Sequence, residues 1–393
     1  MPISADPARL TETSPDVSDN PVIIMIQAAT SAHDLTVDTV ATRAVRVPLT
    51  FALGTSAAVV RAVPLLLVDL RTREGVTGRT YVFCYTAAGA KAVAAHLAEA
   101  VELVRGRAAA PIAIARDLER RFALLGVTGP VRMALSALDM ALWDARATAA
   151  GLPLCTLLGA ARRPIPAYDS RGLGLMPPDV LARETDTLLE TGLPALKLRL
   201  GHPTLAEDLR ALATVQSRLP AGVEVMTDYN QALDTAEAIR RGLALQRHGI
   251  AWLEEPIRHD DYRGNAAIAR ALEVPLQIGE NFNGPEAMLD ALAADACDHV
   301  MPDVARIGGV TGWMRAAGIA AARGIALSSH LAPELSLHLL TASPTSHWLE
   351  YVDWADAVLD EPLQLDGGTA TAPDRPGFGI AWSETKLRRL DEV

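Results

Sequence analysis

Short apolar runs recur about every 25 residues in the second half of the chain, and nearly every run ends in a charged or amide side chain. We interpret these runs as β-strands, because each is short, apolar and bounded by turn residues. The runs are Ile165–Asp169, Ala195–Arg199, Glu224–Asn230, Ile250–Glu255, Pro275–Asn281, His299–Asp303, Ile325–His330 and Trp348–Glu350.

Amphipathic segments such as Thr235–His248 and Pro285–Ala296 separate these runs and predict helices. Strands that alternate with helices are joined by parallel crossovers. Eight such units close into a barrel whose active site lies at the carboxyl ends of the strands. The pattern therefore predicts the α/β class, with a modified (β/α)8 TIM-like barrel over residues 163–355.

The chain before the barrel has a different pattern, which predicts an α+β capping domain over residues 35–162. Strands are expected at Thr36–Val40, Leu65–Leu70 and Thr77–Tyr85. Helical periodicity dominates from Ala87 to Ala150. Leu49–Ala58 is rich in Thr, Ser, Ala and Gly, which fits either a loop that closes over a ligand or a plain surface loop.

The two ends of the chain carry weaker signals. Residues 1–20 are rich in Ser, Pro, Asp and Thr and lack the features of a signal peptide, so residues 1–34 are expected to form an extension. Within it, the apolar run Val22–Ile26 is too short for a membrane anchor. Residues 356–393 are rich in Pro and Gly and are expected to pack back on the capping domain.

Composition narrows the class of protein. The net charge is -11 and the sequence pI is about 5.3, which argues against a nucleic-acid partner. No apolar run is long enough to span a membrane. Cys84, Cys155 and Cys297 show no CxxC spacing, which favours buried thiols in a reduced cytoplasm. We therefore expect a cytoplasmic protein that binds neither membrane nor nucleic acid.

Three carboxylates share one position in successive strand units. Asp228, Glu254 and Glu280 lie 26 residues apart, each near the end of its own predicted strand. Any one of them alone would more often cap a loop, but three at one phase point to a shared cation. Hard oxygen ligands without His or Cys favour Mg2+ over zinc.

Further charged residues end other strands. Lys197 and Arg199 are separated by one residue, so both side chains face the barrel interior, where they either pair with carboxylates or meet an anionic substrate. Asp303 and His330 end the sixth and seventh strands and form a candidate acid/base dyad. Glu350 ends the eighth strand, where it is a site residue or a cap.

From Leu35 to Trp382 the chain resembles the mandelate racemase branch of the enolase superfamily, the mandelate racemase/muconate lactonizing enzyme family. The stretches that carry the resemblance are 168–170 (YDS), 195–201 (ALKLRLG), 228–231 (DYNQ), 252–256 (WLEEP), 278–281 (IGEN), 301–303 (MPD), 307–313 (IGGVTGW), 328–331 (SSHL) and 347–350 (HWLE). The resemblance implies abstraction of the proton alpha to a substrate carboxylate, through a metal-stabilised enediolate.

The same resemblance implies a role for each site residue. Asp228, Glu254 and Glu280 would hold Mg2+, and His330 with Asp303 would be the base. Lys197 would contact the substrate carboxylate, and Glu350, as a protonated donor, would hydrogen-bond one carboxylate oxygen. The residues expected to line the substrate pocket are Ser170, Asn230 and Tyr81, the last within the segment 81–85. A small-molecule carboxylate and a homo-oligomer are the partners that the resemblance implies.

Arg199 departs from the family pattern, in which the second basic residue of this strand is a lysine that acts as a base. Deprotonating arginine at pH 7 costs about 7 to 9 kcal/mol, whereas deprotonating lysine costs about 4.6 kcal/mol. A racemase needs bases on both faces of the substrate, so His330 and Arg199 would have to share the work unless Lys197 substitutes, and Arg199 handicaps racemisation. A dehydratase can work with His330 alone, and Arg199 would then be an electrostatic partner of the substrate.

Three hypotheses therefore stand. The first is a racemase or epimerase of a 2-hydroxy acid, on the density of the resemblance. The alternative is a dehydratase of an acid sugar, an aldonate or aldarate, on Arg199. The minor alternative is a metal-dependent carboxylate-binding protein without turnover, which would bind Mg2+ and ligand but exchange no alpha proton.

Overall fold

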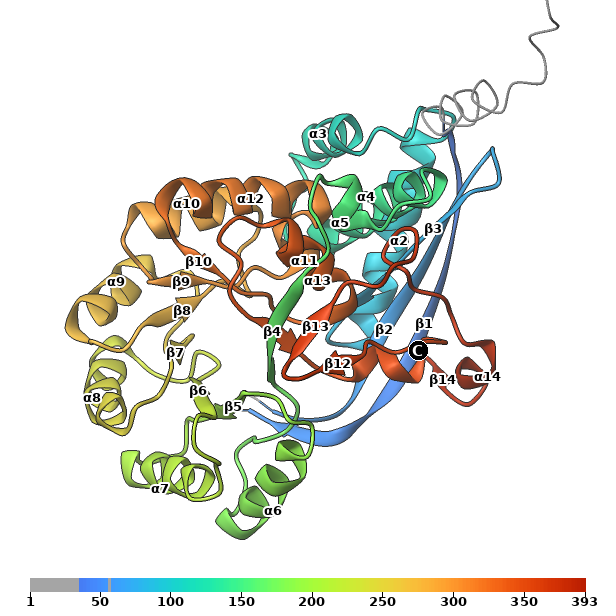
Figure 1. The fold of residues 1–393 in the computed structure, drawn as a ribbon. Helices are drawn as coiled ribbons and strands as arrows, with labels where there is room; N and C mark the ends of the chain where they lie inside the picture. The colour runs from blue at the N-terminus through green and yellow to red at the C-terminus, as the bar shows by residue number, and fades with distance from the viewer. Residues whose placement is uncertain (1–34, 56–57) are drawn as a thin grey trace, which may run out of the picture.

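The computed structural model describes residues 35–55 and 58–393. The N-terminal extension predicted for residues 1–34, with its run Val22–Ile26, lies outside the described residues. Figure 1 shows two bodies in contact, a capping domain with long strands and a barrel ringed by helices. The capping domain comprises β1 (Val37–Gly54), β2 (Val59–Thr72), β3 (Thr77–Phe83), α2 (Ala87–Val104), α3 (Pro111–Phe122), α4 (Gly129–Ala149) and α5 (Leu154–Leu157).

The capping sheet is antiparallel, and its first strand is longer than the sequence predicts. β1 continues to Gly54, and Leu53 and Gly54 pair with Val60 and Val59 of β2. Most of the loop predicted over 49–58 is therefore strand, because pairing with β2 satisfies its backbone groups. The tip also docks on the barrel, where the Leu175 amide donates to the Gly54 carbonyl at 3.0 Å.

The barrel confirms the predicted order of eight parallel strands within the described residues. The strands are β4 (Pro164–Asp169), β5 (Ala195–Arg199), β6 (Glu224–Asp228), β7 (Leu253–Glu254), β8 (Leu276–Ile278), β9 (His299–Val300), β10 (Ala326–Leu327) and β11 (Leu349–Tyr351). Each strand pairs with the next up to β10, and β11 pairs with β4. A parallel bridge from Leu327 to Ser346 closes the ring.

Helices cover the outside of this ring (Figure 1). They are α6 (Pro178–Leu189), α7 (Leu205–Gln216), α8 (Thr235–Leu245), α9 (Tyr262–Ala271), α10 (Pro285–Ala293), α11 (Val304–Ile307), α12 (Gly309–Arg323) and α13 (Pro333–Ala342). The helices predicted over 235–248 and 285–296 are confirmed, and a short 3-10 turn, Gln246–His248, extends the first of them. N-cap side chains fix the positions at which several of these helices begin. Asp234, for example, accepts from the Glu237 amide at 2.8 Å.

Several barrel strands are shorter than predicted, and the backbone turns sharply at or just beyond the carboxyl ends of some of them. β7 and β10 each span two residues, where the sequence suggested about six. The residues that follow the strands adopt left-handed conformations, with φ of +44° at Asn230, +36° at Glu255 and +50° at Leu331. Side chains other than glycine rarely adopt such angles, and strain of this kind gathers at functional sites.

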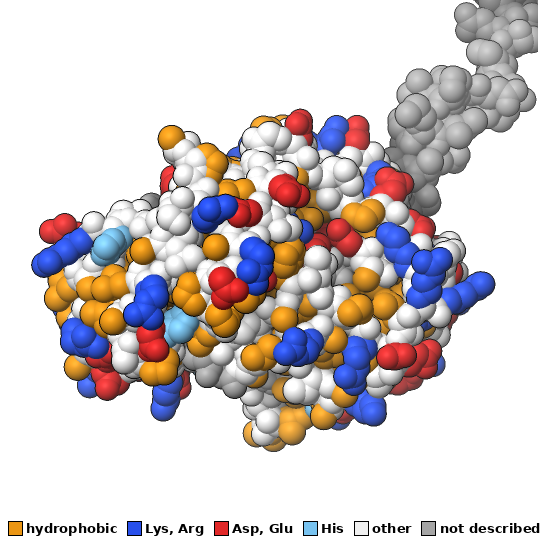
Figure 2. Space-filling model, turned by 90° about the horizontal axis from the view of Figure 1, so that it is seen from below, with side chains coloured by type: hydrophobic (Ala, Val, Ile, Leu, Met, Phe, Trp, Pro, Cys, Tyr) orange, Lys and Arg blue, Asp and Glu red, His pale blue; other side chains and the backbone are white. Residues whose placement is uncertain are grey.

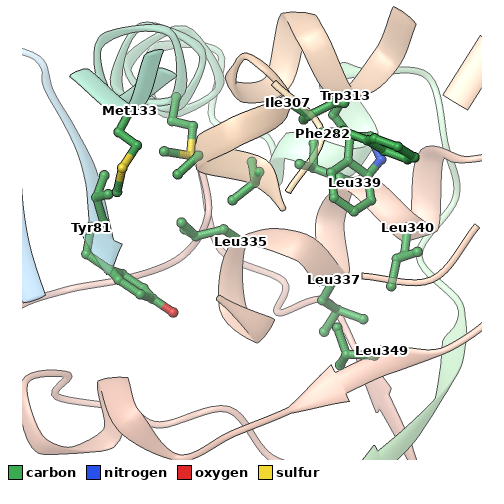
Figure 3. Close-up of a cluster of buried hydrophobic side chains, with 14 of the residues drawn as sticks. Tyr81, Met133, Phe282, Ile307, Trp313, Leu335, Leu337, Leu339, Leu340 and Leu349 are labelled. Carbon is green, nitrogen blue, oxygen red and sulfur yellow. The ribbon is translucent and has the colours of Figure 1, made fainter. Parts of the chain in front are cut away.

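Helix α4 joins the capping domain to the barrel. The Asp139 carboxylate accepts hydrogen bonds from the amide and the hydroxyl of Thr311, at 2.9 and 2.5 Å. Figure 3 shows apolar side chains from both bodies packed together, with Tyr81 and Met133 of the capping domain facing Leu335 of α13. The interface is therefore a continuous core rather than a hinge.

The C-terminal segment contacts both bodies. β14 (Asp391–Glu392) pairs with β1, while β12 (Leu365–Asp366) and β13 (Thr369–Thr371) form a hairpin whose second strand pairs with β4. The remaining elements are the 3-10 turn Trp354–Ala357 and α14 (Glu384–Leu387). The segment thus packs on the capping domain, as the sequence suggests, and also extends the barrel sheet at β4.

On the face seen in Figure 2, basic and acidic side chains are interspersed among hydrophobic ones. No helix in the described part of the chain is long and apolar enough to cross a membrane.

Candidate active site

Three carboxylates converge at the carboxyl ends of neighbouring strands. Asp228 ends β6, Glu254 ends β7, and Glu280 follows β8. One oxygen from each lies within 4.8 Å of the other two. Asp228 and Glu254 are buried, and Glu280 is partly buried. The structure therefore brings the predicted metal ligands together.

The charges at this point fit a divalent cation. Burial and the neighbouring carboxylates of Asp228 and Glu350 raise the pKa of Glu254 to about 8, although the Lys197 ammonium opposes the shift. One ammonium is too little positive charge for these buried acids. Three carboxylates, one of them only partly buried, suit Mg2+, which keeps water or substrate among its ligands.

Lys197 lies among these carboxylates. Its Nζ donates to Glu254 Oε1 at 2.7 Å, and it lies 2.7 Å from Glu350 Oε1 and 3.5 Å from Asp228 Oδ2. Burial lowers the pKa of Lys197, but these anions outweigh burial and raise it well above its usual value. In this arrangement Lys197 is thus an ammonium paired with three carboxylates.

His330 and Asp303 form the predicted pair. His330 Nδ1 lies 2.8 Å from Asp303 Oδ2, so Nδ1 carries the proton and Nε2 is left to act. Nε2 lies 3.3 Å from Glu280 Oε2. Burial lowers the pKa of His330, but the Glu280 and Asp303 carboxylates outweigh burial and raise it to about 9. In this arrangement the imidazole is therefore a charged partner of both carboxylates, and a cation held by Glu280 would lower the pKa again and leave Nε2 as the proton acceptor.

Glu350 differs from the expectation of a protonated donor. Its carboxylate accepts from the Ser170 hydroxyl at 2.6 Å and from the Leu331 amide at 2.7 Å, and it pairs with Lys197. Burial raises its pKa, but Lys197 and His330 outweigh burial and hold that pKa well below its usual range. Glu350 is thus an ionised acceptor in this arrangement, because every neighbour donates to it.

Arg199 is engaged with the loop that follows β4. Its Nη1 donates to the Gly172 carbonyl at 2.8 Å, and its Nη2 donates to the carbonyl and hydroxyl of Ser170, each at 3.0 Å. A guanidinium has donors only, so Ser170 must accept from Arg199 and give its one proton to Glu350. Arg199 therefore orients Ser170 through Nη2, while its buried Nε finds no acceptor among residues 35–55 and 58–393.

The other predicted pocket residues are held by protein groups. Asn230 donates from its backbone to Asp228 Oδ1 at 2.7 Å and from its amide to Asp228 Oδ2 at 3.0 Å, which fixes a metal ligand. The Tyr81 hydroxyl donates to the buried Glu334 carboxylate. Tyr81 also lines a small cavity beside Asp303 and Leu331. It thus lies at the site, with its hydroxyl already committed.

Sequence reasoning missed the residues that support this site. Asn281 donates to Glu280 Oε1 at 3.2 Å and to both Glu255 oxygens at 3.0 Å. Arg306 donates to Asn281 Oδ1. Glu334 holds Tyr81. Their position in the sequence could have identified them, because each lies within four residues of a predicted site residue.

Comparisons with known proteins agree with this geometry. Residues 34–159 match the mandelate racemase/muconate lactonizing enzyme N-terminal domain, and residues 180–386 match an enolase C-terminal domain-like model. L-talarate/galactarate dehydratase from Salmonella typhimurium is 34% identical over 83% of this chain and 82% of its own length.

Two solved structures are also similar. An enolase from alpha proteobacterium BAL199 with bound magnesium has a TM-score of 0.89 at 40% identity, covering 91% of this chain and all of its own. An enolase from Bradyrhizobium, complexed with magnesium and mandelic acid, has a TM-score of 0.87 at 39% identity, covering 92% of this chain and 99% of its own. Magnesium in both agrees with the carboxylate triad at Asp228, Glu254 and Glu280.

Proposed function

We propose that this chain, which belongs to the mandelate racemase/muconate lactonizing enzyme family of the enolase superfamily, is a Mg2+-dependent dehydratase of an acid sugar. The observation that carries the proposal is the engagement of Arg199 with Ser170 and Gly172. Lys197 is held in ion pairs with Glu254 and Glu350, whereas Asp303 orients His330 through Nδ1, so we take His330 as the base. One base suffices for dehydration but not for racemisation through two faces.

The reaction follows from the position of His330. Its Nε2 takes the proton from the carbon next to the substrate carboxylate, while Asp303 holds Nδ1 and stabilises the imidazolium. The same Nε2 then returns the proton to the 3-hydroxyl, and the C3–O bond breaks to release water. The enol that remains tautomerises to a 2-keto-3-deoxy acid. Hydrogen and oxygen balance without any further reactant.

The charge that develops on the substrate carboxylate needs stabilisation, because the alpha carbon is a weak acid. When bound, Mg2+ supplies positive charge at that carboxylate. The Lys197 ammonium adds a second, permanent charge within the same cluster. Trp252 donates from Nε1 to Glu254 Oε2 at 3.0 Å and keeps that ligand oriented.

A racemase of a 2-hydroxy acid remains the second candidate, and one comparison favours it. The similar Bradyrhizobium structure is complexed with mandelic acid, a 2-hydroxy acid. Inversion would require Lys197 or Arg199 to release its carboxylate or carbonyl partners and lose a proton. Deprotonating an arginine, or a lysine that is held by carboxylates, costs free energy. This cost places the racemase below the dehydratase.

The test is to incubate the enzyme with Mg2+ in D2O and follow substrates and products by NMR. The panel contains aldonic and hexaric acids together with aromatic 2-hydroxy acids. A 2-keto-3-deoxy product from a sugar acid supports dehydration. Exchange with inversion in the aromatic set, without such a product, contradicts the proposal and favours the racemase. Binding without any exchange of the alpha proton would indicate a carboxylate-binding protein.

The His330→Asn variant separates chemistry from binding. Asparagine keeps a polar side chain near Asp303 but cannot take the alpha proton. We expect proton exchange to fall by at least about 100-fold, as for loss of a general base, while Mg2+ affinity stays near that of the wild type. Magnesium binding is measured by calorimetry. A variant that still exchanges the proton at the wild-type rate would remove His330 from the mechanism.

A further inference from the structure

Glu280 is a metal ligand that also contacts the catalytic dyad, and its two oxygens have different partners. Oε2 lies 3.3 Å from His330 Nε2, whereas Oε1 accepts from the Asn281 amide at 3.2 Å. The same amide donates to both oxygens of the buried Glu255 at 3.0 Å. The Asn281 side chain therefore holds one oxygen of this ligand while the other oxygen faces the imidazole.

The orientation of the Asn281 amide is set by Arg306, whose guanidinium donates to Asn281 Oδ1. A guanidinium has donors only, so the amide oxygen must face Arg306 and the NH2 group must face the two glutamates. A reversed amide would lose the bond to Arg306 and place its oxygen against the carboxylates of Glu255 and Glu280. Arg306 thus acts on a metal ligand through one asparagine side chain.

Arg306 is held at both its backbone and its side chain. It lies on α11, which Asp303 caps by accepting from the amides of Ala305 and Arg306 at 2.7 and 3.1 Å. The guanidinium carbon of Arg306 lies 4.7 Å from the centre of the Tyr85 ring. A guanidinium over an aromatic ring is attracted by the electrons of the ring face. Because Tyr85 belongs to the capping domain, a residue outside the barrel helps to place Arg306 over Asn281.

Tyr85 occupies a strained turn between β3 and α2. Its φ is +61°, and the Thr86 amide donates across it to the Cys84 carbonyl at 2.6 Å. A three-residue turn with a positive φ at its centre is rare and strained. The position is fixed on both sides, because the Phe83 ring packs 4.1 Å from the Tyr85 ring and Thr86 is the N-cap of α2. Strain of this kind gathers at functional sites, and the contact that it serves here is the one with Arg306.

We propose that Tyr85 is a positioning residue of the magnesium site, although it belongs to the capping domain. It holds Arg306, and Arg306 orients Asn281. Asn281 in turn fixes the metal ligand Glu280. The four side chains form one series of contacts across the two bodies, so the capping domain contributes to Mg2+ affinity. The inference goes beyond the reaction proposed above, because dehydration and racemisation would use the same triad.

The test is calorimetric titration of Mg2+ into the metal-free, full-length protein. In Tyr85→Leu, which keeps an apolar side chain but removes the ring, we expect Mg2+ to bind about 3- to 10-fold more weakly, as for one lost cation–π contact. Tyr85→Phe keeps the ring and should stay within about two-fold of the wild type. Arg306→Met removes the donor to Asn281 and should weaken Mg2+ binding by roughly 10- to 100-fold, as for an outer partner of a metal site. Tyr85 is 44% exposed, so its variants leave the core intact.

Phe51→Leu is the matched control. The Phe51 ring also comes from the capping domain, on β1, and its centre lies 5.5 Å from the guanidinium carbon of Arg171 in the barrel. Arg171 pairs with Asp169 and Asp353, which are not ligands of the triad. Mg2+ affinity in Phe51→Leu should therefore stay within about two-fold of the wild type. Equal weakening in Phe51→Leu and Tyr85→Leu would overturn the proposal, because a general loosening of the interface would explain both.

The double variant Tyr85→Leu/Arg306→Met shows whether the effect passes through Arg306. In the Arg306→Met background, Tyr85→Leu should weaken Mg2+ binding by less than about two-fold further, because the contact that it removes is already lost. A full additional loss, or an unchanged Mg2+ affinity in Tyr85→Leu alone, would overturn the proposal. Thermal unfolding shows which variants are folded, and Tyr85→Leu against Phe51→Leu decides the matter if Arg306→Met does not fold. No substrate enters the titration, so its outcome does not depend on whether the chain is a dehydratase.

Discussion

At the scale of the residue, the site depends on a few buried charges that each have a fixed partner. Asp228 is oriented by Asn230 through two hydrogen bonds, at 2.7 and 3.0 Å. Asp228→Asn keeps the shape of the side chain but removes its charge. We expect Mg2+ affinity to fall by at least about 100-fold, because a lost ligand should cost no less than a lost outer partner. Calorimetric titration with Mg2+ measures the change.

The control for this prediction lies on the same strand. Glu224 begins β6 and is exposed, whereas Asp228 ends it and is buried. Glu224→Gln removes one negative charge without touching the triad, so Mg2+ affinity should stay within about two-fold of the wild type. Equal weakening in both variants would mean that net charge, and not coordination, explains the loss.

Arg199 supports a second prediction at this scale. A lysine in its place reaches fewer of the three acceptors on Ser170 and Gly172 than a planar guanidinium does. Arg199→Lys should therefore lower the free energy of unfolding by about 1 to 3 kcal/mol, keep dehydration within roughly ten-fold, and create no racemase. Thermal unfolding and NMR of the C2 configuration report these outcomes. Inversion at C2 as fast as dehydration would show that position 199 is a base position.

At the scale of the element, α13 is joined to its neighbours through His338. Its Nδ1 accepts from the Cys155 amide at 3.3 Å, and its Nε2 lies 3.2 Å from the Phe378 carbonyl. The imidazole is thus neutral, with one acceptor and one donor nitrogen. Burial lowers the pKa of His338 to about 4. Protonation would place a second N–H against the Cys155 amide.

The sign of the pH effect follows from this lowered pKa. In the unfolded chain the pKa of His338 is near 6.5. The stabilisation that the neutral imidazole gives is therefore complete above pH 6.5. It is lost as the pH falls towards 4, by at most roughly 3 kcal/mol. His338→Gln does not titrate. We expect it to be less stable than the wild type at pH 7 and the difference in Tm to shrink by pH 4.5. The exposed His248→Gln is the control, and a difference that stays constant with pH would contradict the assignment.

The elements also show how far the sequence alone could lead. Eight strand positions, the metal triad and the dyad follow from apolar runs and their polar ends, because a parallel barrel repeats one local pattern. The extended tip of β1 could not be predicted from the sequence pattern, because residues 49–54 are strand only through pairing with β2 and docking at Leu175. The ionised state of Glu350 was missed for a similar reason, since it depends on donors from Ser170 and Leu331.

At the scale of the whole molecule, three segments far apart in the sequence meet at Asp144 of α4. One carboxylate oxygen accepts from the Arg79 amide of β3 at 2.7 Å, and the other accepts from the Phe378 amide of the C-terminal segment at 2.6 Å. Gly377 passes so close that a Cβ there would lie 2.1 Å from the carboxylate. The capping domain and the tail are thus tied together through one buried side chain.

Asp144→Ala should therefore destabilise the whole molecule rather than one domain. It leaves two buried N–H groups without an acceptor, which costs about 2 to 5 kcal/mol. Because α4 also contacts the barrel through Asp139 and Thr311, we expect one calorimetric transition at a lower Tm instead of two separate ones. Asp374→Ala, which removes an exposed carboxylate that pairs with Arg162, should change the free energy of unfolding by less than about 0.5 kcal/mol. If the capping domain of Asp144→Ala melted alone while the barrel kept the wild-type Tm, the two bodies would be independent folding units, and the core that places Tyr81 and Met133 against Leu335 would not be what holds the site together.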